Sequence, residues 1–390
     1  MKKKQKKSLR ASALKITSAF SLMGMATILF ASSFAQGKNG VTHGFKAPTI
    51  PNETCVAYAY ISNNGSNNVS VIDSSTNTVV ATVPVESGPY GVAVTPDSTH
   101  VYVTNEGSNT VSVIDISTNT VVATVPVGLE PLGIAITPDG SFAYVANTGG
   151  TVSVIDTSTN TVVATVILEI GVAAYGVAVT PDGTRVYVTY LNKSNNTSAV
   201  SVIDTSTNSV VATVSLPFDP SSALHGVTVN PTGTFAYVAG DAGVAVIDTS
   251  TYEASLVQGA VLLDEYGVAI NPAGTFAYAT SSANGTVSVI NTLTNLVVAT
   301  ITVGSQPLGV TVKPNDSFVY VANQDSDDVS VIDTSTNTVV ATVPVGTHPI
   351  ALGNFVARLS SDVSAPCRLP TPRPRPTPAP RPTPAPRPMR

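Results

Sequence analysis

The sequence predicts an all-β fold made of seven copies of one four-stranded unit, and three observations support this prediction. The tetrapeptide "SVID" or a close variant occurs seven times. Only 11% of the 390 residues are charged while 43% are hydrophobic, and the frequent Val and Thr residues favour strands. Short turn sequences such as "TPDG" and "DTSTN" divide each copy. Together these features predict that the chain contains little helix.

The copies of this tetrapeptide are regularly spaced along the chain. Their last residues are 42, 41, 48, 44, 43 and 42 positions apart. A period of roughly 40 to 45 residues in an all-β chain is typical of one blade of a β-propeller, in which four-stranded sheets pack around an axis. The seven copies therefore predict a seven-bladed β-propeller. They are Ser70–Asp73, Ser112–Asp115, Ser153–Asp156, Ser201–Asp204, Ala245–Asp248, Ser288–Asn291 and Ser330–Asp333.

One unit can be divided into its four strands. Pro131–Gly140 is an apolar run that ends in a Pro-Asp-Gly turn, and we expect the first strand here. The second, third and fourth strands are expected at Phe142–Asn147, Thr151–Ile155 and Thr161–Val166, with the turn formers "DTSTN" between the last two. The third and fourth strands carry apolar residues on both faces. Such strands need cover on both sides, which stacked blades provide.

The two ends of the array complete each other. Tyr58–Asn63 is a second strand with no first strand before it, and Pro349–Val356 is a first strand with no second strand after it. We expect these two strands to share one closing blade, because closure removes the free edges of an open array. The propeller is therefore predicted to span residues 56–357.

Residues 1–35 have the pattern of a secretory signal peptide. Met1–Arg10 is strongly basic, Ile16–Phe34 is apolar and uncharged, and small residues precede a cleavage site before Gln36. An uncleaved anchor is the alternative, since a stretch of this length could just span a bilayer. We expect export, to the medium, the cell surface or the periplasm, with a lead-in segment over residues 36–55.

The net charge of -5 hides regions of opposite sign. Residues 1–35 carry seven Lys or Arg and residues 366–390 carry six Arg, with no acid in either. The rest holds six cations against all 24 acids and is a poor match for nucleic acid. The tail, residues 358–390, alternates Pro with Arg, Thr and Ala, which is typical of a polyproline II spacer. The alternative is an arm that binds nucleic acid or another anionic polymer.

Cys55 and Cys367 are the two cysteines of the chain. They lie just before and shortly after the two strands that are expected to share the closing blade. Because exported proteins form disulfides, we expect a bond between them that fastens the ring. Two free thiols, or a bond between chains, are the alternatives.

The repeats also carry recognisable motifs. "YVTN" occurs at Tyr102–Asn105 and "YVAN" at Tyr144–Asn147 and Tyr320–Asn323, followed by "SVID", "NTVVATV" and "GVAVTPDG". In these motifs the chain resembles the YVTN-family β-propeller repeat proteins, which include surface-layer proteins of archaea and bacteria. The resemblance covers about residues 56–357 and weakens in blades 4 and 5. It implies an exported propeller with a binding or surface role and no common catalytic set.

Side chains that carry chemistry are scarce. The chain has no Trp, which excludes the tryptophan docking motifs of quinoprotein propellers, and its four His are too few for a copper cluster. We therefore expect a non-enzymatic binding module without a cofactor or metal. The alternative is a hydrolase or lactonase that uses the central funnel with His225 or His348. Asn323–Asp328, "NQDSDD", lacks the spacing of a calcium loop.

Six repeated Asp residues have a simpler explanation than catalysis. Each stands in a turn where its carboxylate can accept hydrogen bonds from the backbone of that turn. We expect this structural role for Asp115, Asp139, Asp156, Asp182, Asp204 and Asp333.

Loop lengths favour one face of the ring for binding. Because the strands alternate in direction, the loops from fourth to first strand and from second to third strand emerge on one face, here called the loop face. The "TPDG" and "DTSTN" turns emerge on the other, the turn face. Insertions occur on the loop face, in segments 166–176, 190–198 and 214–226. Insertions gathered on one face of a repeat array often mark a binding surface.

The residues that enter the first strands add a predicted ring at the mouth of the funnel on the loop face. They are Tyr90, Leu132, Tyr175, His225, Tyr266, Leu308 and Ile350, with Glu130, Asp264, Glu265 and His348 beside them. Aromatic residues carry much of the energy of interfaces. For a monomer that binds a protein or cell-envelope ligand, the expected anchors are Tyr175, Tyr190, Phe218 and His225. The alternative is that these are tolerated surface loops and core-capping tyrosines.

Overall fold

The computed structural model describes residues 57–357 except 170, 220–221 and 259–263. Contacts divide the chain into residues 1–51 and 52–390, and every described residue belongs to the second unit. The expected signal peptide, the lead-in, both cysteines and the tail lie outside the described residues. The helical content of the described residues is one short 3-10 helix, η1 (Glu106–Ser108). None of its helices is long and apolar enough to cross a membrane.

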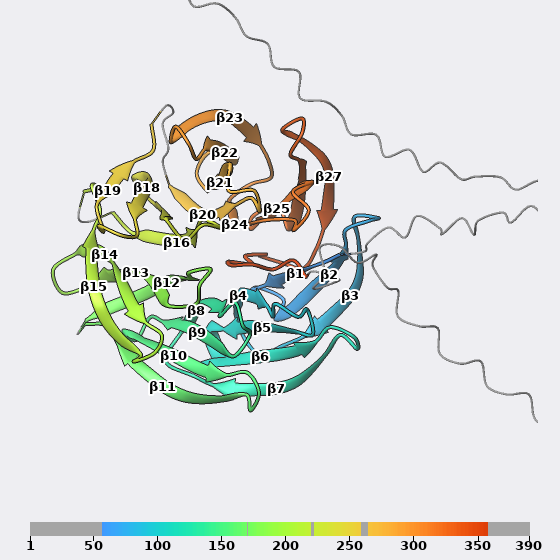
Figure 1. The fold of residues 1–390 in the computed structure, drawn as a ribbon. Coiled ribbons are helices and arrows are strands. Elements are labelled where there is room, and N and C mark those ends of the chain that lie inside the picture. The colour runs from blue at the N-terminus through green and yellow to red at the C-terminus, as the bar shows by residue number, and fades with distance from the viewer. Residues whose placement is uncertain (1–56, 170, 220–221, 259–263, 358–390) are drawn as a thin grey trace, which may run out of the picture. The chain divides into compact units, whose positions relative to one another are not determined.

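The described strands form seven antiparallel sheets, numbered as blades 1 to 7 in chain order (Figure 1). Blade 1 contains β1 (Tyr58–Asn63), β2 (Asn68–Asp73) and β3 (Thr78–Pro84), and blade 2 contains β4 (Pro89–Val94), β5 (His100–Asn105), β6 (Thr110–Asp115) and β7 (Thr120–Pro126). Blade 3 contains β8 (Pro131–Ile136), β9 (Phe142–Asn147), β10 (Thr151–Asp156) and β11 (Thr161–Ile167). Blade 4 contains β12 (Val172–Val179), β13 (Arg185–Asn192), β14 (Thr197–Asp204) and β15 (Ser209–Ser215). Blade 5 contains β16 (Leu224–Val229), β17 (Phe235–Gly240), β18 (Gly243–Asp248) and β19 (Ala254–Leu256). Blade 6 contains β20 (Glu265–Ile270), β21 (Phe276–Ser281), β22 (Thr286–Asn291) and β23 (Leu296–Thr302). Blade 7 contains β24 (Pro307–Val312), β25 (Phe318–Asn323), β26 (Asp328–Asp333) and β27 (Thr338–Pro344).

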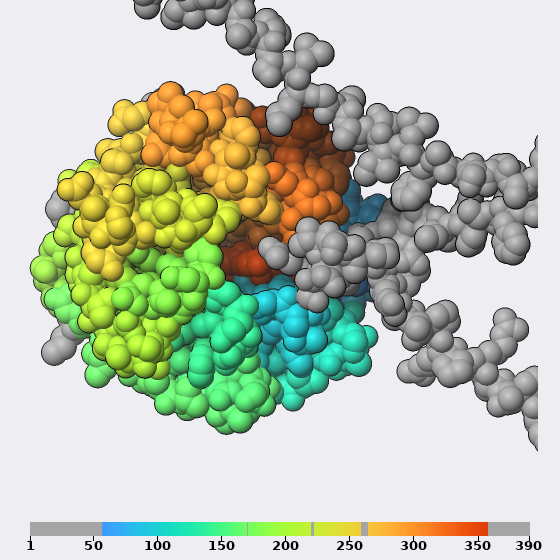
Figure 2. All heavy atoms as spheres, in the orientation of Figure 1, coloured from blue at the N-terminus to red at the C-terminus, as the bar shows by residue number. Residues whose placement is uncertain are grey.

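The blades pack side by side around an axis. The first strand of each blade is innermost, and each contacts the first strand of the next, from β4 through β8, β12, β16 and β20 to β24. Figure 2 shows one face of this ring, with the blades following one another in chain order around its centre. The hydrophobic core lies between neighbouring sheets, where most apolar residues of the second and third strands are fully buried. The prediction of a seven-bladed propeller is confirmed.

The C-terminal described residues close the ring. Pro349 and Val356 form antiparallel bridges with Asn63 and Ala59 of β1, and Ala357 N donates to Tyr58 O at 2.9 Å. The same segment bonds the other neighbour, since Val92 N of β4 donates to Leu352 O at 3.0 Å. It makes isolated bridges rather than a continuous strand. The reason is that Ala351 and Gly353 have positive φ, which interrupts extended pairing.

Tyrosines link four pairs of neighbouring blades by hydrogen bonds. Seven second-strand tyrosines are almost fully buried, and they are Tyr60, Tyr102, Tyr144, Tyr187, Tyr237, Tyr278 and Tyr320. Tyr102 Oη donates to Oδ1 of Asn160 at 2.6 Å, in the last turn of the following blade. Asn160 has a φ of 53°, a left-handed conformation that Asn tolerates well. The Asn of "STN" therefore serves both the turn and the contact between blades.

Candidate functional site

A backbone irregularity brings the predicted ring residues to the axis. In β4 the pairing register with β5 shifts between Pro89 and Val92, and the first strands of the other four-stranded blades shift at the matching position. A bulge of this kind redirects a side chain. The glycine in the bulge is required, because a Cβ on Gly91 would collide with the carbonyl oxygen of Leu132 in the next blade. The residue before that glycine is left facing the centre.

These residues form one cluster that closes the loop-face end of the axis, here called the plug. Its buried members are Tyr90, Leu132, Leu308, Ile350 and Leu352, and half-buried Tyr175 and Tyr266 pack against them. The hydroxyl groups of Tyr90 and Tyr266 contact each other from distant blades. Burial raises the pKa of both hydroxyl groups, which therefore keep their protons at neutral pH. Leu352 is the member that sequence reasoning did not name.

His225 completes the plug and links it to the surface. Its ring stacks on Tyr266 at 4.3 Å between centroids and meets the edge of Tyr175 at 6.0 Å. Its Nε2 lies 3.0 Å from Asp241 Oδ1, with side-chain exposures of 15% for His225 and 44% for Asp241. The hydrogen bond from His225 lowers the pKa of Asp241. Sequence reasoning missed Asp241, although its position in a loop-face connection was a usable signal.

Glu265 is the most unusual carboxyl group of the loop face. It is the first residue of β20, a position that Pro occupies in β4, β8 and β24. Its side chain is fully buried. Neither carboxyl oxygen has a hydrogen-bond partner among the described residues. Burial, and then the charge of Asp264, raise the pKa of Glu265 to about 8. Asp264 itself is exposed.

The structure places four other predicted residues away from the plug. Tyr190 is only 4% exposed and packs with Val172 and Ala199 inside blade 4. Phe218 is half-buried against the cluster between blades 4 and 5. The expectation that Tyr190 and Phe218 stand on the rim with Tyr175 and His225 is therefore corrected. Tyr190 is paired within the sheet as part of β13, and Phe218 packs against a neighbouring apolar cluster.

Glu130 and His348 are exposed, in connections between blades. Thr148 donates to Glu130 Oε2 at 2.6 Å, and the backbone N of His348 donates to Asp327 Oδ1 at 2.8 Å. Half-buried Glu106 lies in η1 and has its pKa raised by burial and then by Glu130. Glu106 is a loop-face residue that sequence reasoning did not single out.

The other end of the axis is an open channel with a volume of about 550 Å³. It is lined by the first strands from their bulge glycines to the prolines of the "TPDG" turns. None of the described lining residues is titratable. The plug separates this channel from the loop face. The funnel therefore opens on the turn face rather than among the inserted loops.

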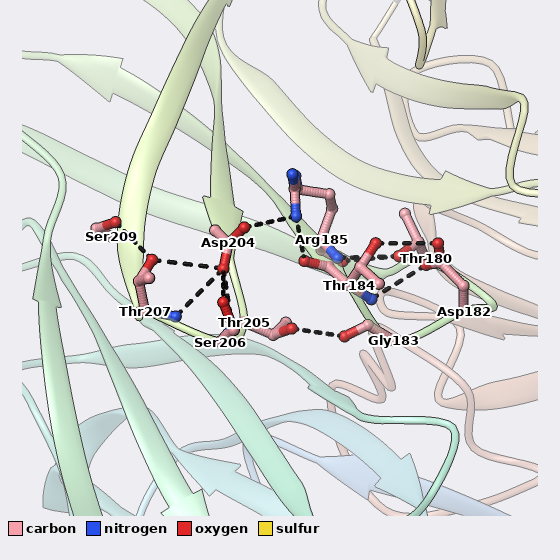
Figure 3. A network of polar contacts seen from close by, with 10 residues as sticks. All are labelled: Thr180, Asp182, Gly183, Thr184, Arg185, Asp204, Thr205, Ser206, Thr207 and Ser209. Carbon is pink, nitrogen blue, oxygen red and sulfur yellow. Dashed lines mark hydrogen bonds and ion pairs between the residues drawn. The ribbon is translucent and has the colours of Figure 1, made fainter.

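Carboxylates of the turn face bind their own turns (Figure 3). Asp182 Oδ1 accepts from Thr180 Oγ1 at 2.5 Å and from Thr184 N at 3.1 Å. Asp204 Oδ1 accepts from Ser206 N at 2.9 Å, and its other oxygen pairs with Arg185 at 2.7 Å. Matching bonds occur at the other repeated Asp residues, as their structural role predicts. In the described part no group of three His, Cys, Asp or Glu is placed to hold a metal ion.

Comparison with known proteins supports the fold. A family model described as YNCE-like beta-propeller matches residues 39–140. A solved chain of Kuenenia stuttgartiensis hydrazine synthase is 26% identical with a TM-score of 0.66, and the match covers 76% of this chain and 99% of that chain. A functionally unknown protein from Desulfotomaculum acetoxidans DSM 771 is 18% identical with a TM-score of 0.62 over the same shares, which shows the fold alone. No curated protein matches.

These likenesses agree with the architecture. The matched family segment contains blades 1 and 2 and the beginning of blade 3, and the remaining blades repeat the same strands and turns. The repeated motifs, the matched family model and the seven-bladed ring together fit a β-propeller repeat protein of the YVTN type.

Proposed function

We propose that the protein is an exported, non-enzymatic binding module whose loop face holds a basic segment of a partner protein. The observation that carries this proposal is the half-buried stack of Tyr175, His225 and Tyr266, bonded to Asp241 through His225. The charges of Glu106 and Asp241 both act on Tyr266. Aromatic groups next to anions suit Lys and Arg side chains, through cation–π and charge-assisted contacts.

The charge of the ring agrees with a basic partner. The described residues include three Lys or Arg against 22 Asp or Glu. Arg185 and Lys313 belong to the turn face. Among the described residues, Lys193 is therefore the one basic residue in the loop-face connections. The loop-face acids are Glu86, Glu106, Glu130, Glu169, Asp219, Asp241, Asp264, Glu265, Asp325, Asp327 and Asp328. Such an excess attracts cations and steers their approach.

The channel favours binding over catalysis. A hydrolase in the funnel would need a general acid or base that reaches its substrate, and the described lining residues offer none. The plug separates His225 from the channel, and His348 is exposed outside the plug. The hydrolase remains testable, because lactone hydrolysis that disappears in His225→Ala and His348→Ala would contradict the proposal.

The test compares two variants of the tagged mature protein. Partners are captured from the native envelope, identified, and their affinity is measured by calorimetry. Tyr175→Ala with His225→Ala should weaken binding by about 30-fold or more, since interface anchors contribute about 2 kcal/mol or more. Phe142→Ala, an exposed aromatic residue of the turn face, is the matched control and should bind like wild type. Equal affinities for the two variants would rule out the loop face.

A further inference from the structure

The turn-face mouth of the channel has one gap. Six blades surround it with a turn between first and second strands. Four of the turn prolines pack near the turn glycine of the next blade, as Pro96 does near Gly140. In blade 1 the first strand is the C-terminal segment, which has no such turn after it. The place of a seventh turn is taken by the outgoing chain at Ala357.

A groove lies at this gap. It has a volume of about 260 Å³, and its apolar lining comes from neighbouring blades and from the closing segment. The lining residues are Val94, Thr95, Pro96, Ser98, Ile136, Pro138, Asn354 and Val356. A polyproline II helix loses little entropy on docking, and its prolines can pack against the apolar members of this lining. The groove therefore suits a proline-rich occupant.

Carboxylates stand beside the groove. Asp97 and Asp139 directly follow the lining residues Pro96 and Pro138, and both are exposed. Asp182 and Asp316 lie in the corresponding turns of blades 4 and 7. Asp97, Asp139 and Asp182 accept hydrogen bonds from their own turns, and these bonds leave the negative charge in place. The occupant should therefore combine prolines with cations.

We propose that the occupant is the chain's own C-terminal tail, with residues 368–390 folded back onto this groove. The tail starts one residue after Ala357, whose backbone is bonded to Tyr58 O on the turn face. Residues 358–390 contain eleven Pro, seven Arg and one acid. Prolines enter the apolar groove, and arginines pair with Asp97 and Asp139.

The geometry favours this occupant over one from solution. A polyproline II segment advances about 3.1 Å per residue, so the ten residues from Arg358 to Cys367 can extend about 30 Å, enough to turn back. Tethering at the mouth gives the tail an effective concentration on the order of millimolar. Two or three weak arginine contacts then suffice for docking, and high salt should release the tail.

The test is photo-cross-linking in the full-length protein, with a benzophenone amino acid at Thr377. At about 0.02 M salt, monomeric product should carry cross-links to segments 94–98, 136–139 and 354–356, and about 1 M salt should abolish them. Asp97→Asn with Asp139→Asn should lower the yield about fivefold, as expected for two exposed ion pairs. The turns should survive, because Asn315 already holds Ser317 in the same way in blade 7.

The matched control is Asp115→Asn with Asp156→Asn. These residues belong to the same two blades and lose the same charge, but they stand in the outer turns, away from the mouth. The control should keep the wild-type yield. Cross-links spread over the ring, or an equal loss in both variants, would overturn the proposal. Cross-links found only in covalent dimers would assign the groove to a second copy, and that outcome would overturn it as well.

Discussion

The turn face and the loop face both carry many carboxylates, but the structure holds them in different ways. On the turn face, Asp115 Oδ1 accepts hydrogen bonds from Ser117 N at 2.8 Å and Thr118 N at 3.0 Å. Bonds of this kind, led by the one from the Ser117 hydroxyl, lower the pKa of Asp115. On the loop face, burial raises the pKa of Glu106 and Glu265 instead.

This difference separates residues that the fold needs from residues that it tolerates. A carboxylate that recurs in nearly every blade and bonds its own turn stabilises the repeat. A carboxyl group that occurs once and is buried without a partner costs stability, and such groups concentrate at functional sites. Asp241 is intermediate, since His225 stabilises its charge. The loop face is thus where the chain departs from its own repeat.

The largest expected effect concerns the turn face, where the two ends of the ring meet at Tyr58 and Ala357. If Cys55 and Cys367 are bonded, the closed loop holds about 310 residues, and the loop-entropy model gives a stabilisation of about 5 to 6 kcal/mol, with smaller gains often measured. Reduction, or Cys55→Ser with Cys367→Ser, should lower the melting temperature by several degrees. Mass spectrometry of unreduced protein should find no free thiol. Two free thiols would contradict the predicted disulfide bond.

The next effect tests whether Glu265 costs stability. Its folded-state pKa of about 8 lies above the ordinary 4.5, so the unfolded chain releases this proton first as the pH rises. The cost therefore grows from about pH 4.5 to pH 8 and is on the order of 3 kcal/mol at pH 7. Glu265→Leu should raise the free energy of unfolding by about this amount, as Leu224 fills the same position in blade 5.

Urea unfolding between pH 5 and pH 8 measures this gain. Asp264→Asn is the control, because Asp264 is exposed and its replacement should change the free energy of unfolding by less than about 0.5 kcal/mol. A gain in Glu265→Leu that does not vary with pH would show that the buried charge is not its cause. A stabilised variant that also loses the partner would tie Glu265 to the loop-face function.

Sequence reasoning predicted the repeat-borne part of the molecule well. Seven copies at similar spacings and two incomplete ends were enough to predict the blade number and the closing blade, because every copy follows the same strand pattern. The ring residues Tyr90, Leu132 and His225 followed from the same register. What the pattern could not supply was the bulge before each inner glycine, which turns those side chains to the axis and forms a plug.

The departures from the repeat were harder to predict. Phe218 lies in an insertion, and an insertion has no copy elsewhere in the chain that would tell whether its aromatic residue is exposed. Tyr190 lies in β13 at the position of Asn105 in β5, which is buried, so the repeat register was a usable signal for its burial. Glu265 is polar at a position that Pro occupies in three other blades, and sequence alone suggested a surface residue. The structure buries its side chain completely.

A smaller effect concerns the contacts that the turn face makes between blades. Tyr102→Phe removes the hydroxyl that donates to Asn160, which should cost about 1 kcal/mol of unfolding free energy. Asn160→Gly keeps the left-handed backbone and removes the acceptor, so the double variant should cost little more than either single one. Tyr187→Phe is the control, because Tyr252 replaces this Asn in blade 5. Additive costs in the double variant would mean that the two groups act independently.

The smallest effect should have the opposite pH dependence to that of Glu265. The pKa of Asp115 is lowered in the folded state, so its contribution is present above the ordinary value of 3.8 and is lost as the pH falls through the folded value. Asp115→Asn keeps the turn, as Asn291 does with Leu293 and Thr294. The exposed charge limits the cost to less than about 0.5 kcal/mol at pH 7. Urea midpoints should show a small deficit at pH 7 that closes near pH 3, whereas the Glu265→Leu gain grows with pH; slopes of the same sign would remove the contrast between the two faces.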